Sequence, residues 1–272
     1  MENIISIQDV SKIYRIGNEK VVALDNVSLN ISKGEVCCFL GTSGSGKSTL
    51  LNLLAGLEKP TKGRIVIKDN ELHKLSEKKL TKFRQNYIGF VFQSYNLIPT
   101  LTALENVCLP LTFKGISKRK RENRARKMLK DVALETHLKH KPTQMSGGQQ
   151  QRVGIARAFV SKPEIVFADE PTGNLDTKTT LDVMEIITKM AKENNQTLII
   201  VTHDIEISKY ADRTFYIRDG RIDRIEAKSA NIWGGPYEWY KEKDKKRIFA
   251  GSGVLVDGIP IGGNSFSTCD GS

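Results

Sequence analysis

Long apolar runs are missing from this sequence of 272 residues. The longest, such as Val36–Leu40 and Leu198–Val201, are far too short to cross a bilayer as a helix. The first residues, Met1 to Asn3, do not begin a basic region followed by an apolar stretch, so we expect no signal peptide. These absences argue against a chain that spans a membrane by itself.

Cysteine is scarce and follows no recognisable pattern. The four cysteines, Cys37, Cys38, Cys108 and Cys269, lack the spacing of metal ligands. Cys37 and Cys38 also fall inside an apolar segment, where a side chain is expected to be buried. We therefore expect reduced, buried thiols in a cytoplasmic protein rather than a metal site or a disulfide framework.

Acidic residues are outnumbered, and the formal net charge is +11 at neutral pH. Such an excess favours an anionic partner, either nucleic acid or the inner face of a membrane. Much of the excess is local, because residues 118–130 hold eight basic side chains and one acid, Glu122. Two interpretations of this segment stay open: a solvated helix face, and a patch that faces a membrane.

Strand-like and helix-like patterns alternate along most of the chain. This alternation predicts an α/β core with a parallel sheet. Residues from about 95 to 160 contain helix-like segments only, which predicts a helical subdomain inserted into the core. We expect strands within Ile4–Ile31 (two or three short ones) and at Glu35–Leu40, Arg64–Ile67, Tyr87–Phe92, Ile165–Ala168 and Leu198–Val201, and helices at Ser48–Leu57, Ala103–Val107, Lys118–Val132, Gln149–Ser161 and about Thr179–Glu193.

The composition changes again after residue 227. Residues 1–227 fit one large α/β domain, whereas residues 228–272 are rich in aromatic, glycine and basic residues. Two interpretations of Lys241–Arg247, which lies beside Trp239, are equally open: contact with an anionic membrane, and a disordered tail. We treat residues 228–272 as a C-terminal extension of unknown order.

A glycine-rich loop lies between a predicted strand and a predicted helix. Residues 41–49 read Gly-Thr-Ser-Gly-Ser-Gly-Lys-Ser-Thr and fit the phosphate-loop pattern G-x-x-x-x-G-K-[ST]. Glycines let backbone N–H groups turn inward around phosphate oxygens, and the following helix adds the positive end of its dipole. Lys47 should reach the β- and γ-phosphates, and the Ser48 hydroxyl should ligate Mg²⁺. The predicted nucleotide contacts are Gly41, Ser43, Gly44, Ser45, Gly46, Lys47, Ser48 and Thr49.

Two acids, Asp169 and Glu170, follow the apolar segment Ile165–Ala168. Buried strands do not normally end in paired carboxylates unless an ion partners them. Downstream of a phosphate loop, Asp169 should hold Mg²⁺ through water. Glu170 should polarise the attacking water as a general base.

The segment Met145-Ser146-Gly147-Gly148-Gln149 lies between the phosphate loop and the two acids. This order resembles the ATP-binding-cassette (ABC) ATPases over about residues 4–226, although Met145 stands where leucine is common. The resemblance implies a P-loop NTPase with a RecA-like parallel sheet, an N-terminal antiparallel β subdomain and an inserted helical subdomain. It also implies ATP hydrolysis with Mg²⁺.

The resemblance further implies a role for each remaining motif residue. The signature residues Ser146, Gly147, Gly148 and Gln149 would complete the site of a second subunit, so that a head-to-tail homodimer encloses two ATP molecules. The other implied roles are adenine stacking by Tyr14, contact with Mg²⁺ or water by Gln93, coupling between the two sites by Asp176, and a hydrogen bond from His203 to the γ-phosphate.

A narrower resemblance lies in Phe92–Val107 and Pro171–Asp176, which look like lipoprotein-releasing, macrolide- and antimicrobial-peptide-exporting and cell-division ATPases. It implies a separate integral membrane permease with an extracytoplasmic domain, and a peripheral position on the cytoplasmic face of the inner membrane. The substrate would be a peptide, an antibiotic or a lipoprotein. By this resemblance Tyr95–Asn106 forms a groove for a permease helix, contacted through exposed Tyr95, Leu97 and Ile98, although burial of these side chains stays an alternative.

Two other functions compete with this interpretation. A soluble ABC ATPase acting on ribosomes would carry two cassettes, and one acting on chromosomes would carry a long coiled coil. This chain has one cassette, and 52 residues separate Gln93 from Ser146. No aromatic–basic pattern in the core indicates base stacking, so no specific nucleic acid is expected. A small-molecule kinase would have no use for Ser146–Gln149.

Overall fold

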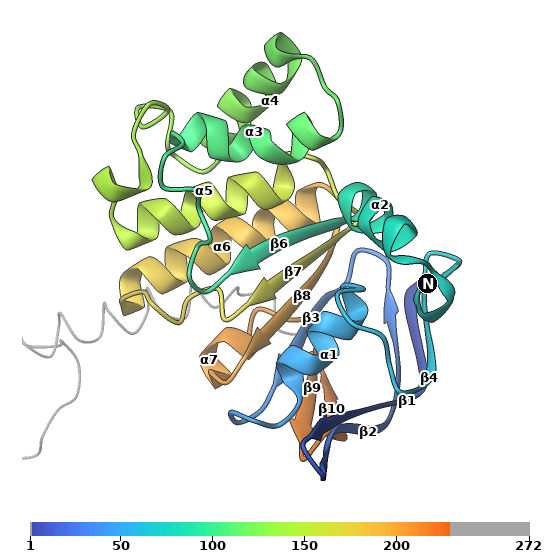
Figure 1. Cartoon of the computed structure of the whole chain (residues 1–272). Coiled ribbons are helices and arrows are strands. Elements are labelled where there is room, and N and C mark those ends of the chain that lie inside the picture. The colour runs from blue at the N-terminus through green and yellow to red at the C-terminus, as the bar shows by residue number, and fades with distance from the viewer. Residues whose placement is uncertain (1, 229–272) are drawn as a thin grey trace, which may run out of the picture. The chain divides into compact units, whose positions relative to one another are not determined.

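A six-stranded sheet forms the centre of the computed structural model, which describes residues 2–228 (Figure 1). Its strand order is β10-β9-β3-β8-β7-β6, in which the strands from β9 to β6 run parallel. β10 closes one edge as the antiparallel partner of β9. The strands are β3 (Val36–Leu40), β6 (Ile88–Phe92), β7 (Ile165–Asp169), β8 (Thr197–Thr202), β9 (Arg213–Arg218) and β10 (Arg221–Ala227).

The middle strands are buried along their whole length, because helices cover one face of the sheet, and a helix together with a second, antiparallel sheet covers the other. On β3, Cys38 and Leu40 belong to one apolar cluster, which includes residues of α5 (Gly147–Phe159) and α6 (Thr177–Glu193). Cys37 and Phe39 belong to a second cluster with α1 (Lys47–Leu54). Alternate side chains of one strand thus join the two halves of the core.

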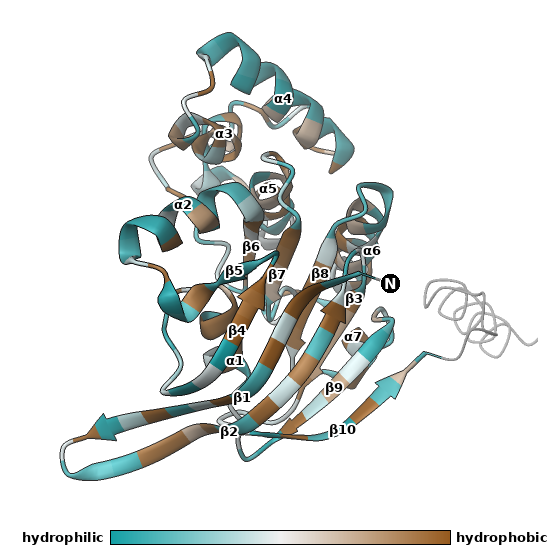
Figure 2. Cartoon of the chain, turned by 90° about the vertical axis from the view of Figure 1, so that its right-hand side faces the viewer, coloured by the Kyte–Doolittle hydropathy of each residue, from teal (hydrophilic) through white to brown (hydrophobic). Residues whose placement is uncertain are grey.

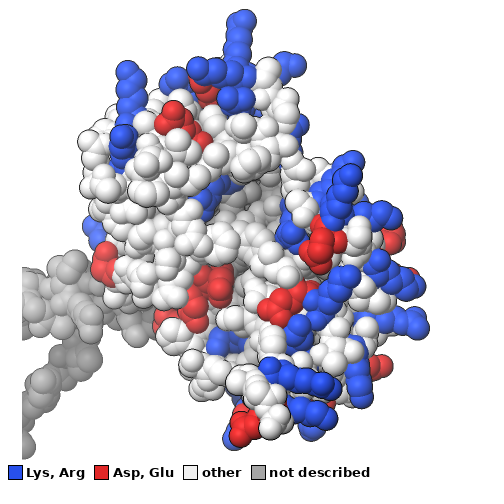
Figure 3. Space-filling view, viewed as in Figure 1, with Lys and Arg blue, Asp and Glu red and all other residues white. Residues whose placement is uncertain are grey.

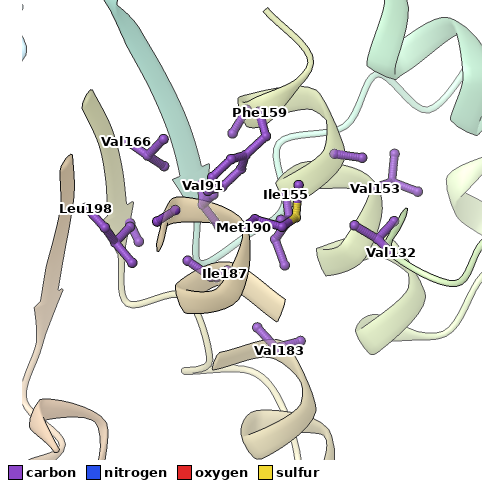
Figure 4. Packing of buried hydrophobic residues seen from close by; sticks show 14 of the residues in the cluster. Val91, Val132, Val153, Ile155, Phe159, Val166, Val183, Ile187, Met190 and Leu198 are labelled. Carbon is purple, nitrogen blue, oxygen red and sulfur yellow. The ribbon is translucent and has the colours of Figure 1, made fainter. Parts of the chain in front are cut away.

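Figure 4 shows the first cluster from close by. Strand residues meet side chains of α5 and α6, and Val132 joins them from the C-terminal end of α4 (Lys118–Asp131). The inserted helices therefore share one continuous core with the sheet. The labelled members are Val91, Val132, Val153, Ile155, Phe159, Val166, Val183, Ile187, Met190 and Leu198.

A second, antiparallel sheet has the order β2-β1-β4-β5. Two or three short strands were expected within Ile4–Ile31, but the structure has two strands of 14 residues (Figure 2). Asp9 (φ 49°) and Asn26 (φ 53°) are left-handed, and the strand register shifts between Ile7 and Val10. These bulges interrupt the apolar alternation that marks a continuous strand. The strands are β1 (Asn3–Ile16), β2 (Glu19–Ser32), β4 (Lys62–Ile67) and β5 (Asn70–Glu71).

The helical region begins after β6 and ends with α5, as the sequence predicted. The largest boundary error is at α3, which runs past the predicted end at Val107 and contains Pro110. The predicted end of α1 at Leu57 was also wrong, because this helix ends at Leu54. A capping box between Thr102 and Glu105 starts α3. The remaining helices are α2 (Glu77–Tyr87), α3 (Ala103–Phe113), α4 (Lys118–Asp131), α7 (Ile205–Ser208) and the 3-10 turns η1 (Leu72–Lys74) and η2 (Pro142–Gln144).

Three of the cysteines lie within residues 2–228, and all three are buried free thiols, as expected. Burial raises the pKa of Cys38 to about 12 and also raises the pKa values of Cys37 and Cys108, so these thiols stay protonated. Cys269 and the predicted extension, apart from Lys228, lie outside the described residues. None of the helices within residues 2–228 has the length and apolar character that a membrane crossing requires.

Candidate functional site

Four neighbouring strands of the six-stranded sheet bring the predicted catalytic residues to one edge. The phosphate loop follows β3, His203 follows β8, Asp169 and Glu170 follow Ala168 of β7, and Gln93 follows β6. Parallel strands present their carboxyl ends on the same side, where open α/β sheets bind ligands. The sheet order thus gathers groups that lie far apart in the sequence.

The phosphate loop takes a path that only glycine permits at key positions. Gly44 (φ 78°) and Gly46 (φ 104°) are left-handed, and a Cβ on Gly46 would lie 2.5 Å from the Ala23 carbonyl oxygen. Gly46 caps α1, whose first turn contains no acidic residue. The positive end of α1 therefore faces the loop without a neutralising carboxylate.

Lys47 starts α1 and is only 7% exposed. Its ammonium group donates to the Thr42 carbonyl at 2.7 Å. Burial lowers the pKa of Lys47, and the charges of Glu170 and Asp169 partly counteract this effect. The buried Ser45 hydroxyl has no hydrogen-bond partner within residues 2–228. A loop with N–H groups, an ammonium group and this spare hydroxyl fits a phosphate group.

Glu170 is held in place by the end of β8. Its backbone is left-handed (φ 44°), a strained conformation for a residue with a side chain. The Thr202 hydroxyl donates to Oε2 at 3.0 Å, and Nδ1 of His203 lies 2.9 Å from Oε1. This geometry brings the two predicted catalytic residues, Glu170 and His203, into direct contact. Thr202 was not predicted to be a functional residue.

Asp169 lies beside Glu170 at the end of β7. Burial, followed by the charge of Glu170, raises the pKa of Asp169, while Lys47 acts in the opposite direction. A bound cation would relieve both effects, so this carboxylate fits the predicted Mg²⁺ site. Ser48 follows Lys47 in the first turn of α1. The Gln93 side chain lies against Gly173, where a Cβ would be 2.6 Å from Nε2.

The signature residues lie at the start of α5 and are satisfied locally. Ser146 and Gln149 form a capping box, in which Ser146 N–H donates to Gln149 Oε1 at 2.9 Å. Gln149 Nε2 also lies 3.1 Å from Nε2 of His137. A Cβ on Gly147 would lie 2.8 Å from the Tyr95 hydroxyl, and one on Gly148 would lie 2.5 Å from Thr179 Cγ2. A side chain at either position would therefore require Tyr95 or Thr179 to move.

Asp176 has a local role that the sequence did not predict. It caps α6, since Oδ1 accepts from the Thr179 N–H at 3.0 Å and Oδ2 accepts from the Thr179 hydroxyl at 2.7 Å. These bonds lower the pKa of Asp176. Through Thr179, Asp176 lies beside Gly148. Within residues 2–228 no hydrogen bond or ion pair joins Ser146–Gln149 or Asp176 to the phosphate loop, Glu170 or His203.

Tyr14 lies on β1 and is half-buried. Its hydroxyl donates to Glu58 Oε2 at 2.7 Å, and the Lys12 ammonium group lies 4.9 Å from its ring centroid. Burial, together with this hydrogen bond, raises the pKa of Tyr14. These contacts orient the ring, while its stacking on adenine stays a prediction.

Comparison with known proteins now places the chain in a family. Residues 24–173 match the family model described as ABC transporter. This chain belongs to the ABC transporter family. It is similar to the uncharacterised ABC transporter ATP-binding protein MJ0796 of Methanocaldococcus jannaschii, with 48% identity over 226 residues that cover 82% of this chain and 96% of that protein.

The ATP-binding protein of a lipoprotein-releasing system and a solved dimeric structure are also similar to this chain. The lipoprotein-releasing system ATP-binding protein LolD of Legionella pneumophila is 44% identical over 219 residues, covering 80% of this chain and 96% of LolD. A solved dimeric structure of the cassette MJ0796, in a post-hydrolysis state with ADP and Pi, superposes with a TM-score of 0.77 at 47% identity, covering 82% of this chain and 98% of that one. The predicted family, α/β fold, ATPase activity and use of ATP with Mg²⁺ are confirmed.

In this ABC ATPase the segment expected to meet a permease is less exposed than the sequence suggested. Ile98 is 41% exposed, but Tyr95 is half-buried and Leu97 packs against the core. Tyr95 and Asn96 are left-handed, and Arg157 donates to both of their carbonyl oxygens, at 2.8 and 2.5 Å. The prediction of three exposed apolar contacts was therefore wrong for Tyr95 and Leu97, because these bonds turn the chain inward.

A buried amide holds the next part of the same segment. Asn106 is fully buried, accepts from the Ile98 N–H at 2.8 Å and donates to the carbonyl oxygens of Ile98, Leu101 and Thr102, each at 3.1 Å. Residues 98–102 are therefore a rigid loop on the surface of the helical region.

Proposed function

We propose that this ATPase is the motor subunit of a transporter or mechanotransmission complex, working as a head-to-tail homodimer on a separate membrane permease. One observation carries the proposal: the phosphate loop with Glu170 and the signature loop with Asp176 are two separate groups in one chain. A second copy, turned head to tail, would bring the signature loop of each subunit to the phosphate loop of the other. The dimeric form of the solved relative supports this arrangement.

The phosphate-loop group would bind and cleave ATP. The N–H groups of Gly41, Ser43, Gly44, Ser45 and Gly46 would surround the phosphates, with Thr49 close behind them, and Tyr14 would stack on adenine. Lys47 would exchange its bond to the Thr42 carbonyl for the β- and γ-phosphates. Mg²⁺, when held by Ser48, Gln93 and Asp169, supplies positive charge that offsets the phosphate charge.

Glu170 would take the proton of the attacking water. Its carboxylate is suited to this role because Thr202 and His203 fix its orientation. His203 would donate a hydrogen bond to the γ-phosphate on the side facing away from Glu170. Thr202 acts as a positioning residue, because its hydroxyl contacts Glu170 and accepts from the Asp204 N–H at 3.1 Å.

The signature loop would bind the γ-phosphate of the partner copy. The capping box uses the N–H of Gln149, so the N–H groups of Gly147 and Gly148 stay available at the positive end of α5. A phosphate oxygen that accepts hydrogen bonds from these two groups would close the dimer, and its loss after hydrolysis would reopen it. Asp176, which lies beside Gly148 through Thr179, would transmit this closure to the other site.

The permease, its extracytoplasmic domain and the substrate are also part of this proposal. The similarity to LolD, the ATP-binding protein of a lipoprotein-releasing system, supports a lipoprotein-like substrate, and we extend the proposal to a peptide or an antibiotic. Binding to the permease would hold the ATPase at the cytoplasmic face of the membrane. The exposed Ile98, on a loop that Asn106 makes rigid, would contact a short permease helix.

Affinity purification tests this proposal. The tagged Glu170→Gln chain is isolated with ATP from gently solubilised native membranes, and its partners are identified by mass spectrometry. We expect an integral membrane protein with a large extracytoplasmic domain. A Glu170→Gln, Ile98→Glu chain is the matched control, which should still form the ATP-bound dimer but recover less permease. Recovery of only soluble proteins, ribosomes or nucleic acid would favour a soluble ABC ATPase instead.

A further inference from the structure

Helix α4 carries an unusual concentration of positive charge. Eight of its 14 residues are basic, and two, Glu122 and Asp131, are acidic. Its buried face consists of Ala125 and Leu129, so the cations occupy the remaining circumference. Within the described part of the chain, one ion pair, Lys118–Glu122 at 4.0 Å, involves a cation of α4. The basic residues are Lys118, Arg119, Lys120, Arg121, Arg124, Arg126, Lys127 and Lys130.

The cations at the start of α4 do not stabilise this helix. Four consecutive cations, residues 118–121, form the first turn, where the helix dipole is already positive. That turn contains no acid, and the Ser117 side chain makes no capping bond. Positive charges at a helix start are unfavourable, and within residues 2–228 the Lys118–Glu122 pair at 4.0 Å is the only ion pair that offsets them.

An exposed aromatic side chain lies next to these cations. Phe113 ends α3, four residues before the N-cap of α4, and is 73% exposed. A single exposed apolar side chain is ordinary on a protein surface. An aromatic beside a dense basic cluster is instead the combination that interfacial membrane segments use.

Helix α2 adds positive charge on the other side of Phe113. The Gln85 side chain, in the last turn of α2, donates to the Phe113 carbonyl oxygen. Lys78 and Lys82 are exposed and lie on the same face of α2 as this end, at spacings of three and four residues. Figure 3 shows Lys and Arg side chains over α4 at the top of the view and over α2 at the upper right.

We propose that the α2–α4 surface, formed by Phe113, the exposed cations of α4, and Lys78 and Lys82 of α2, binds anionic phospholipid headgroups directly. The cations would lie against the phosphates while Phe113 enters the headgroup layer. Nucleic acid is the less favoured partner, because α4 has no aromatic residue for base stacking and Phe113 stands alone. This contact adds a lipid anchor to the permease contact of the proposed function, and it needs no permease.

Vesicle binding by the purified full-length chain, without permease, tests this proposal. Vesicles of phosphatidylcholine alone are compared with vesicles containing about one third phosphatidylglycerol, by co-sedimentation at low and high salt. We expect binding to the anionic vesicles only, and its loss at high salt because exposed charges are screened. The variant Arg119→Gln, Lys120→Gln, Lys127→Gln should bind on the order of a hundredfold more weakly, since each cation near an anionic leaflet contributes several-fold.

A charge-matched control separates this surface from net charge. The variant Lys33→Gln, Lys62→Gln, Arg218→Gln removes three exposed cations elsewhere and should bind like the natural chain. Both variants should keep the natural ATPase rate, which shows that they fold. Phe113→Ser should weaken vesicle binding by about tenfold while leaving salt dependence unchanged.

Three results would overturn the proposal. One is equal binding by the α4 variant and the natural chain, which would place the lipid contact elsewhere. Another is equal loss in the α4 variant and its control, which would make net charge the only cause. The third is no binding to anionic vesicles together with binding of duplex DNA through the same α4 residues.

Discussion

The phosphate-loop edge and the signature loop both carry groups that can bind phosphate, but they differ in which polar atoms are already hydrogen-bonded within the chain. At the edge, Lys47 and Glu170 are partly buried and already bonded to Thr42, Thr202 and His203. At the signature loop, side chains satisfy each other, while the N–H groups of the two glycines stay available. In the proposed function, the groups that cleave ATP therefore lie within one copy, and the signature loop of a second copy completes the site.

Replacing the proposed catalytic base, Glu170, should have the largest effect on turnover. Glu170→Gln keeps the bond from Thr202 but removes the proton acceptor, so turnover should fall by about 10²–10⁴-fold. Because the phosphate-loop and signature contacts remain, the ATP-bound dimer should accumulate. Phosphate release and light scattering with ATP measure the two effects. Normal hydrolysis by this variant would exclude Glu170 as the base.

The next largest effect is expected at the signature loop. Ser146→Arg removes the cap of α5 and introduces a large cation next to Gly147, so ATP-driven dimerisation and turnover should be lost. ATP affinity of the monomer should be nearly unchanged, because Ser146 does not contact its own phosphate loop. Fluorescent nucleotide titration measures that affinity, with Ser146→Thr as the capping control. Weaker ATP binding by the monomer would contradict the assignment across two subunits.

Turnover should fall less when Glu170 is kept and only a hydrogen bond that orients its carboxylate is removed. Thr202→Val deletes the hydroxyl that donates to Oε2, so turnover should fall by roughly tenfold while KM for ATP stays unchanged. Thr202→Ser keeps the hydroxyl and should restore most of the rate. If both variants reduce turnover equally, packing rather than this hydrogen bond explains the loss.

The smallest expected effect concerns stability and its pH dependence. The raised pKa of Asp169 means that its charged form destabilises the nucleotide-free protein, and this cost grows as pH rises through the folded-state pKa. Asp169→Asn should therefore raise the melting temperature at neutral pH, and the difference should vanish at low pH, where Asp169 is protonated. Thermal unfolding without nucleotide or Mg²⁺ tests this. An unchanged or lower melting temperature at neutral pH would show that attraction to Lys47 dominates.

The fold was predictable from the sequence where a strand is buried on both of its faces. β3, β7 and β8 are buried on both faces, so their apolar runs predicted them to within one residue. No prediction covered α2, in which only Leu80 and Phe83 are buried, or the largely exposed β10. The predicted end of α3 at Val107 was wrong, because the helix continues to Phe113 with Pro110 inside it.

The site was predictable from the sequence where the functional residues lie together in one short segment. The phosphate loop is defined by its own glycines, and Asp169 and Glu170 by their place after a strand. Thr202 and Arg157 were missed because each acts on a residue more than 30 positions away. Thr179 was missed because the helix was predicted to begin at about Thr179, whereas α6 begins at Thr177 and Asp176 is its N-cap. The inward turn of Leu97 likewise depends on Arg157, 60 residues later in the sequence.

The position of β3 at the middle of its sheet also determines when, during synthesis of the chain, the nucleotide site can form. Its hydrogen-bonded neighbours are β8 and β9, which leave the ribosome more than 150 residues later. Until residue 218 has been made, the strand that carries the phosphate loop lacks at least one of these partners. A nascent chain that already contains the loop, the acids and the signature therefore cannot assemble a complete nucleotide site, and ATP can act as a folding ligand only for the nearly finished domain.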